Sequence, residues 1–159
     1  RQGDLDLVAA IDARLEASKL AQEGRAVSRR CGGRILISGA ELYGGECLPA
    51  YAQRVAAGQA PGHQAVALAL LAVSNDLDED TAVMIELHCF LVSLLSAAIR
   101  LTALDHMAAQ RLLLRAQSVL GAALTENRTM HWQEIGGFAP QIELMQFHHV
   151  HAVMHMFVS

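Results

Sequence analysis

Four of the eight histidines lie in a C-terminal segment without lysine or arginine, Gln141–Ser159. If this segment is helical, His148 lies three residues before His151, and His155 lies four residues after it. Side chains at both spacings meet on a helix surface. Neutral imidazoles placed in this way can hold Ni, Zn or Cu, in an open and weak site and not a structural cage. The alternative is that the histidines form the polar face of an amphipathic helix.

The opposite side of the same segment is apolar. Two neighbouring helical stripes carry large apolar residues together with His149, and they make a face too wide for the edge of a small domain. Exposed apolar faces of this kind mark interaction sites. We therefore expect residues 137–159 to form a docking tail that orders against a partner. The two stripes consist of Ile142, Met145, His149, Val153 and Met156, and of Phe147, Val150, Met154 and Phe157.

The sequence contains no signature of catalysis. It has no G-x-S-x-G or H-E-x-x-H motif, and the glycine-rich stretch Gly39–Gly45 lacks the Lys-Ser/Thr of a P-loop. Cys31, beside two glycines and several arginines, is either a reactive thiol or a buried structural cysteine. The acids of Asp76–Asp80 either collect a cation or complement the dipole at a helix start. We therefore predict that the chain is not an enzyme.

Composition narrows the class of protein further. A chain of 159 residues is long enough for one domain with a buried core, and abundant Ala and Leu with three prolines favour helices. Seven of the twelve Lys and Arg lie between Arg1 and Arg34, and no basic stripe carries interleaved aromatics, which argues against nucleic-acid binding. The scattered cysteines Cys31, Cys47 and Cys89 indicate reduced core residues of a cytoplasmic protein.

The chain begins with neither Met nor a signal peptide, and we expect that the N-terminal part of a longer protein is missing. Its apolar residues recur at helical spacing, without a strand pattern of useful length. The segment Lys19–Ile37 is expected to be helical to about Arg30, and Gly32-Gly33 either interrupts or loosens that helix. The glycine-rich stretch Ser38–Glu46 is expected to be a turn. Pro49 suits the first turn of a helix, and Asp78 suits an N-cap. The expected helical segments are Leu5–Ser18, Lys19–Ile37, Pro49 to Gly58, Gly62–Val73, Glu79–Leu101 and Met107–Leu124.

The segment Glu79–Leu101 is apolar on nearly all sides, which is typical of the middle of a bundle. We therefore predict an all-α, single-domain helical bundle around this central helix. Small side chains along one stripe would let another helix approach closely. The stripe consists of Cys89, Ser93, Ala97 and Arg100, with Glu86 and Phe90 beside it.

The inner run of this helix, Ala82–Ile99, is barely long enough to cross a membrane. Because it contains Glu86 and His88, we expect a buried helix instead. Arg100 follows in the last turn, where a cation complements the helix dipole. Its role is either this structural one or the binding of a partner.

A series of short motifs, in their order and spacing, resembles the urease accessory protein F family over nearly the whole chain. The family's early segment, with its Leu-Pro-x-Gly motif, has no counterpart here. The matching stretches are Arg25-x-x-Ser28-x-x-x-Gly32-x-Arg34, Gly62-His63-x-Ala65-Val66, Ser93-x-x-Ser96-Ala97-Ala98-x-Arg100-Leu101, Gln110-Arg111-Leu112-Leu113, Phe138-Ala139-Pro140, and His149 followed by Phe157-x-Ser159.

Two stretches depart from the family pattern. After Arg100 the family usually has Pro-Leu-Gly-Gln, whereas residues 103–106 here read Ala-Leu-Asp-His. In the tail, the places usually held by Glu, Tyr and Arg are taken by Val150, Val153 and His155. Part of the polar and aromatic contacts that such a tail offers a partner is therefore absent.

The resemblance implies an all-helical, non-enzymatic assembly factor that often dimerises. Such a protein binds urease accessory protein D (also called H), recruits the GTPase accessory protein G, and helps to deliver nickel to apo-urease. Nickel would be bound weakly or in transit, with no intrinsic cofactor, and no membrane partner is expected. The alternative is a helical metal-binding protein that uses His148, His151 and His155. The expected partner-binding residues are Arg100, His106, Gln110, His149, Val153, Met156, Phe157 and Ser159.

Overall fold

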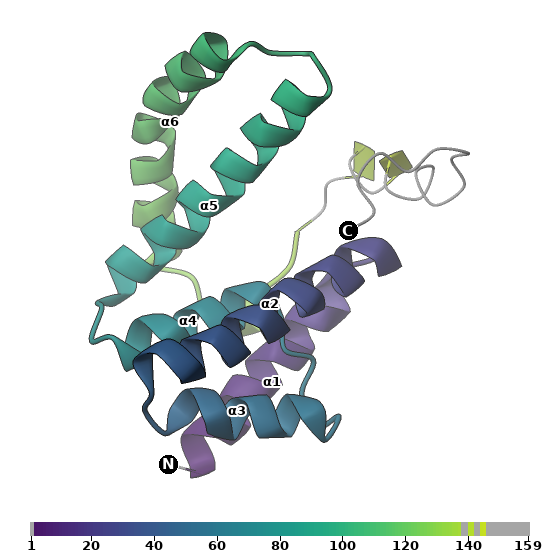
Figure 1. Ribbon diagram of the computed structural model, residues 1–159, viewed down its shortest axis with the longest axis vertical. Coiled ribbons are helices and arrows are strands. Elements are labelled where there is room, and N and C mark those ends of the chain that lie inside the picture. Colours follow the sequence, from purple (N-terminus) through teal and green to yellow (C-terminus); the bar gives the residue numbers. More distant parts are fainter. Residues whose placement is uncertain (1, 138–139, 142–143, 146–159) are drawn as a thin grey trace. The chain divides into compact units, whose positions relative to one another are not determined.

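The computed structural model describes residues 2–137, 140–141 and 144–145, and it confirms the all-α prediction for them (Figure 1). This part of the chain contains six α-helices, one short 3-10 helix and no strand. The helices are α1 (Gln2–Ser18), α2 (Gln22–Tyr43), α3 (Cys47–Ala56), α4 (Gln64–Ser74), α5 (Glu79–Arg100), α6 (His106–Asn127) and the 3-10 helix η1 (Trp132–Glu134).

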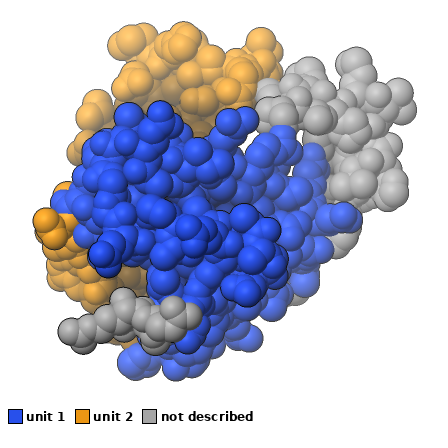
Figure 2. Space-filling model, turned by 60° about the horizontal axis from the view of Figure 1, so that its bottom comes forward, with its two compact units in different colours: residues 1–75, 131–159 blue, residues 76–130 orange. Residues whose placement is uncertain are grey.

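The helices form two compact units, coloured separately in Figure 2. Unit 1 contains α1 to α4 and η1. Unit 2 is Asp76–Met130 and contains α5 and α6. The docking tail expected at 137–159 falls largely outside the described residues, so that expectation stays a prediction.

Two glycines let α2 and α4 pack closely side by side. A Cβ atom on Gly32 would lie 2.0 Å from the carbonyl oxygen of Gly62, just before α4. A Cβ atom on Gly39 would lie 3.0 Å from Cδ1 of Leu71, in the second half of α4. Since the earlier glycine meets the start of α4 and the later glycine meets its second half, the two helices run parallel.

This packing corrects the prediction for α2. We expected the helix to end near Arg30, with a turn at Ser38–Glu46, but it continues from Gln22 to Tyr43. Glycine costs roughly 0.5–1 kcal/mol relative to alanine inside a helix. Here that cost is offset by close contact with α4, which no local sequence rule detects. The other helices confirm their predicted positions to within a few residues.

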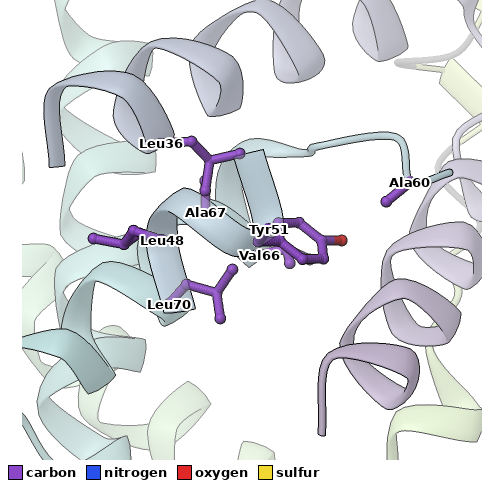
Figure 3. Packing of buried hydrophobic residues seen from close by; sticks show 7 residues of the cluster. All are labelled: Leu36, Leu48, Tyr51, Ala60, Val66, Ala67 and Leu70. Carbon is purple, nitrogen blue, oxygen red and sulfur yellow. The ribbon is translucent and has the colours of Figure 1, made fainter. Parts of the chain in front are cut away.

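The core of unit 1 lies between α2, α3 and α4 (Figure 3). Complete burial of each large apolar side chain contributes about 1.5–3 kcal/mol. Helix α1 covers this core with partly buried Leu5, Val8, Ala9 and Leu15. The hydroxyl of Tyr51 points out of the aliphatic cluster toward α1 (Figure 3). The buried cluster consists of Leu36, Leu48, Tyr51, Ala60, Val66, Ala67 and Leu70.

Unit 2 is a hairpin of two long helices with well-made starts. Asp78 is the N-cap of α5, as predicted, and its Oδ1 accepts a hydrogen bond from the Thr81 backbone N–H at 2.7 Å. Asp105 caps α6 in the same way, with Ala108 as the donor at 2.7 Å. A side-chain oxygen at the N-cap satisfies one of the four orphan N–H groups of a helix start.

The length and apolar character of α5 agree with the sequence analysis, but its burial does not. None of its residues is fully buried, because in unit 2 the helix packs against α6 alone. Within the described residues, α5 is also the one helix that is long and apolar enough to cross a membrane. A single helix of this kind is weak evidence for a membrane span, because the core helix of a soluble protein meets the same criteria.

Candidate functional site

Three predicted partner-binding residues meet at one end of the hairpin. Arg100 ends α5, His106 begins α6, and Gln110 lies one turn further along. All three are exposed, and beside them Leu101 is 49% and Met107 is 63% exposed. We call these five residues the hairpin tip. A surface that mixes a cation, an imidazole, an amide and large apolar groups has the composition of a protein-binding patch.

The backbone fixes the shape of this tip. The N–H of Ala103 donates to the carbonyl of Ala98 at 3.0 Å, and the N–H of Thr102 donates to that of Ile99 at 2.9 Å. This pair of bonds is the Schellman ending of a helix, in which glycine usually takes the left-handed position. Here Thr102 takes it, with φ 57°. A side chain costs about 1–2 kcal/mol in that conformation, so the surrounding structure must hold it in place.

The opposite end of the hairpin is closed by an ion pair. The Arg128 guanidinium, just after α6, donates to both carboxylate oxygens of Asp80, with Nε lying 3.0 Å from Oδ1. The hydrogen bond from Arg128 lowers the pKa of Asp80, and the bond from the Thr81 N–H likewise lowers the pKa of Asp78. Both acids are thus engaged at a helix start, which supports the structural alternative for Asp76–Asp80.

A pocket of about 460 Å³ lies along the first half of α5. Among the residues lining it are Asp80, His88 and Cys89, whose side chains are metal-ligand types. They do not come together: within the described residues no three His, Cys, Asp or Glu side chains are placed to hold an ion. The pocket therefore carries no assigned chemistry.

A buried carboxylate organises unit 1. Asp12 of α1 is fully buried, and its Oδ2 accepts hydrogen bonds at 2.7 Å from the Tyr51 hydroxyl and from the Gly62 N–H. Its Oδ1 accepts from the His63 N–H at 3.2 Å. Burial, followed by the bond to Asp12, raises the pKa of Tyr51, so the phenol remains a donor. One carboxylate thus joins α1 to α3 and to the start of α4.

His63 extends this junction to the surface. Its ring is fully buried, and Nε2 lies 2.7 Å from Oε2 of Glu16, while Nδ1 has no partner. Because a carboxylate only accepts, the proton of the neutral ring belongs on Nε2. Glu16 in turn pairs with Arg25 at 3.4 Å and with Arg29 at 3.6 Å. The chain of contacts ends in arginines of α2, at the edge of unit 1.

The start of α4 is capped from a distance by other helices. Its own N-cap residue, His63, makes no side-chain capping bond. Asp12 accepts from the N–H groups of Gly62 and His63, directly before α4, and the Ser28 hydroxyl of α2 accepts from the N–H of Gln64, its first residue, at 3.4 Å. Gly62 holds φ 77°, where glycine is favoured. We call Asp12, Glu16, Ser28, Gly32, Tyr51, Gly62 and His63 the α4 junction.

The junction explains several motif residues whose role the sequence left open. Ser28, Gly32, Gly62 and His63 all belong to matching stretches, and here they position helices. Its central residue, Asp12, was not singled out, although a signal existed. It follows Leu5 and Val8 and precedes Leu15 on the apolar stripe of α1, where a charge is unexpected.

The cysteines only partly follow the prediction. No disulfide forms among them. Cys31 and Cys47 are partly buried, but Cys89 is exposed on α5, so the prediction of a core position is wrong for Cys89. The prediction failed for the same reason as the predicted burial of α5: within unit 2, no helix packs against the side of α5 that carries Cys89.

The remaining site predictions fall outside the described residues. They are the candidate metal ligands His148, His151 and His155, and the candidate partner-binding residues His149, Val153, Met156, Phe157 and Ser159. These assignments stay predictions.

Comparison with known proteins gives a consistent family. The sequence model of the UreF family matches residues 1–117, from α1 into α6. The urease accessory protein UreF of Paenarthrobacter aurescens is 34% identical over 152 residues, which cover 96% of this chain and 68% of the relative. The proteins of the same name from Lachnoclostridium phytofermentans and Kocuria rhizophila are 32% and 31% identical, covering 98% and 99% of this chain and 68% and 69% of the relatives.

Proposed function

The chain belongs to the UreF family of urease accessory proteins, and we propose that it acts as a non-enzymatic scaffold in nickel insertion. The family takes part in urease maturation, is soluble, works with other urease accessory proteins and is not known to be catalytic. In the proposal, the chain binds accessory protein D (also called H). Their complex recruits the GTPase accessory protein G in the cytoplasm and acts on apo-urease.

The observation that carries this proposal is the similarity to named UreF proteins along nearly the whole chain. A match that included only the α4 junction would support a shared fold alone. The alignment also spans the hairpin tip, where Arg100, His106 and Gln110 are exposed together. We therefore assign the tip and the predicted tail as the two surfaces that contact accessory proteins.

Nickel is cargo in this proposal and not a resident cofactor. The ion would pass through the assembly, and the tail histidines would bind it weakly at most. A nickel titration of the isolated chain separates this from the alternative of a metal-binding protein. Weak binding that disappears after combined His148→Ala, His151→Ala and His155→Ala replacement supports the proposal. Tight, stoichiometric binding that survives this replacement contradicts it.

Capture of partners from a defined mixture tests the scaffold role. The chain is immobilised and offered purified accessory proteins D and G, with and without GTP. We expect D to bind alone and G to bind only when D is present. If the chain captures neither protein, although circular dichroism shows that it is folded, the proposal is contradicted.

Two further variants divide the interface between its two surfaces. Deletion of residues 147–159 should leave the melting temperature nearly unchanged and abolish capture of D and G. Combined replacement of Arg100, His106 and Gln110 by alanine should weaken capture, whereas Arg14→Ala on the exposed side of α1 should not. If the deletion unfolds the chain, the tail belongs to the core. If the truncated chain still captures both partners, the tip is the principal surface.

A further inference from the structure

The backbone of the hairpin is strained at one position, Thr102. Among the described residues other than glycine, Asp76 and Thr102 hold a positive φ, of 55° and 57°. Aspartate visits this left-handed region comparatively often, because its short side chain can bond to nearby backbone. A β-branched residue is an outlier there. The strain therefore lies at the end of α5, directly after the exposed Leu101.

Few contacts hold Thr102 in this conformation. The two bonds of the Schellman ending run from its own N–H to the carbonyl of Ile99 and from the N–H of Ala103 to the carbonyl of Ala98. A contact between larger apolar side chains at the last two positions often reinforces such an ending. Here both positions hold alanine. Because Thr102 and Ala103 are exposed, water can replace the two bonds when the ending opens.

The strained turn decides whether the hairpin tip is assembled. With the turn closed, the exposed Leu101, His106, Met107 and Gln110 lie together at one end of the hairpin. Outside a helix, the backbone of a β-branched residue favours the extended region. If Thr102 moved to that region, both bonds of the ending would break and the end of α5 would fray. The residues of the tip would then no longer be held side by side.

We propose that the hairpin tip is a two-state element and that Thr102 sets the balance between its closed and open forms. The closed form has the Schellman ending and the open form lacks it. Threonine keeps the open form accessible, whereas glycine at this position would favour the closed form. The closed form binds an accessory protein, which draws the tip into it. Only this last step rests on the proposed function, because the balance itself belongs to the isolated chain.

Hydrogen exchange of the Ala103 amide tests the balance in the isolated chain. Thr102→Gly should raise the protection of this amide, corrected for the intrinsic exchange rate, about fivefold, because relief of the left-handed strain outweighs the extra freedom of glycine in the open form. Thr102→Val is the matched control. It removes the hydroxyl but keeps the β-branch, and the protection should not rise.

Asp76→Gly controls for a general effect of glycine on the hairpin, since it places glycine at the other positive φ. The Ala103 amide should exchange as in the wild type. Equal protection in the wild type and in Thr102→Gly overturns the proposal. An equal rise in Thr102→Val or in Asp76→Gly also overturns it, because the strain at Thr102 is then not the cause.

Binding of purified accessory protein D tests the second step. Proline fixes φ near −65° and excludes the closed form, so Thr102→Pro should weaken binding at least about tenfold, which corresponds to about 1.4 kcal/mol. Thr102→Gly should bind no more weakly than the wild type. Helical circular dichroism and the melting temperature should stay nearly unchanged in both variants, since position 102 follows the last turn of α5.

The outcomes separate this inference from the proposed function. If Thr102→Pro binds accessory protein D as tightly as the wild type does, the closed form is not the binding form and the inference is overturned. If the wild type itself binds no accessory protein, the proposed function fails. The exchange of the Ala103 amide then still decides whether the tip is a two-state element.

Discussion

Both units of this chain are built from helices, but they differ in how much of the helix surface is buried. Unit 1 holds nearly all buried residues of the described chain, including the charged Asp12 and the ring of His63. In unit 2 the single residue counted as buried is Ala109, while α5 and α6 carry some of the largest exposed apolar side chains. Unit 1 buries most of its apolar surface internally, whereas unit 2 leaves much of its apolar surface exposed.

Carboxylates show the difference most clearly. In unit 1, Asp12 is dehydrated and accepts three hydrogen bonds from two other elements, so it decides how helices meet. In unit 2, Asp78 and Asp105 are exposed and cap only their own helices. Substitution in unit 1 should therefore affect stability strongly, and substitution in unit 2 should affect binding first.

The largest effect is expected at Gly32. Its Cβ would lie 2.0 Å from the Gly62 carbonyl oxygen and 2.8 Å from the Gln64 nitrogen, and backbone cannot move aside as a side chain can. Gly32→Ala should lower the free energy of unfolding by more than about 3 kcal/mol, measured by urea denaturation.

The adjacent glycine is its control. A Cβ on Gly33 meets nothing within 4 Å. Gly33→Ala should be neutral or stabilise by up to about 1 kcal/mol, since alanine favours the helix. If Gly32→Ala is as neutral or stabilising as Gly33→Ala, helix propensity, and not contact with the α4 junction, governs this position.

The next effect concerns Asp12. Asp12→Ala leaves the Tyr51 hydroxyl and two backbone N–H groups buried without an acceptor, and should cost about 3 kcal/mol. Tyr51→Phe removes one donor and should cost less, about 1 kcal/mol. In a double-mutant cycle, the combined variant should lose less than the sum of the two. Strict additivity would show that the hydroxyl and the carboxylate do not stabilise each other.

The sequence predicted those features of the fold that depend on residues close together in the chain. Apolar spacing located the helices, and the acid of Asp78 located a helix start, because both depend on neighbours in sequence. The predicted end of α2 was wrong because Gly32 and Gly39 serve the close packing of α2 against α4, and they do not end the helix. The role of Asp12 was missed because its partners, Tyr51 and Gly62, are distant in sequence.

The site was predictable to a similar degree. The resemblance selected Arg100, His106 and Gln110, and the hairpin brings them to one tip. It also selected Gly62 and His63, but could not say that they serve packing, because a motif reports a position and not its contacts. The side of α5 that carries the exposed Phe90 and Leu94 was predicted to be buried. An apolar helix has the same sequence pattern whether or not another helix of its own chain packs on every side of it.

Two leucines of α5 test which of its sides packs against α6. Leu91 is partly buried and is assigned to that side, whereas Leu94 is 56% exposed. Leu91→Asp should destabilise the hairpin by about 2 kcal/mol, because a charge is then partly buried without a partner. Leu94→Asp should leave the melting curve of the monomer nearly unchanged. Thermal unfolding at low chain concentration checks both, and the reverse ranking would assign the wrong side of α5 to α6.

The smallest effect is expected from the ion pair that closes the hairpin. Arg128 lowers the folded pKa of Asp80 below its ordinary value of 3.8, so the stability from this pair is present above that pH. It is lost as the pH falls further, through the lowered pKa. Both side chains are well exposed, and such pairs contribute little to stability and are screened by salt.

The direction of the pH effect is nevertheless definite, because protonation of Asp80 removes the pair. In low salt, the protection of amides near the start of α5 against hydrogen exchange, after correction for the intrinsic exchange rate, should fall below about pH 4 in the wild type. The Asp80→Asn variant, which has no carboxylate at this position to titrate, should lose less protection there. Amides around Asp12 serve as the internal reference, because Asp80→Asn leaves that junction untouched. If the two proteins lose protection equally at α5, the pair does not hold the hairpin closed, and the packing of α6 on α5 alone does so.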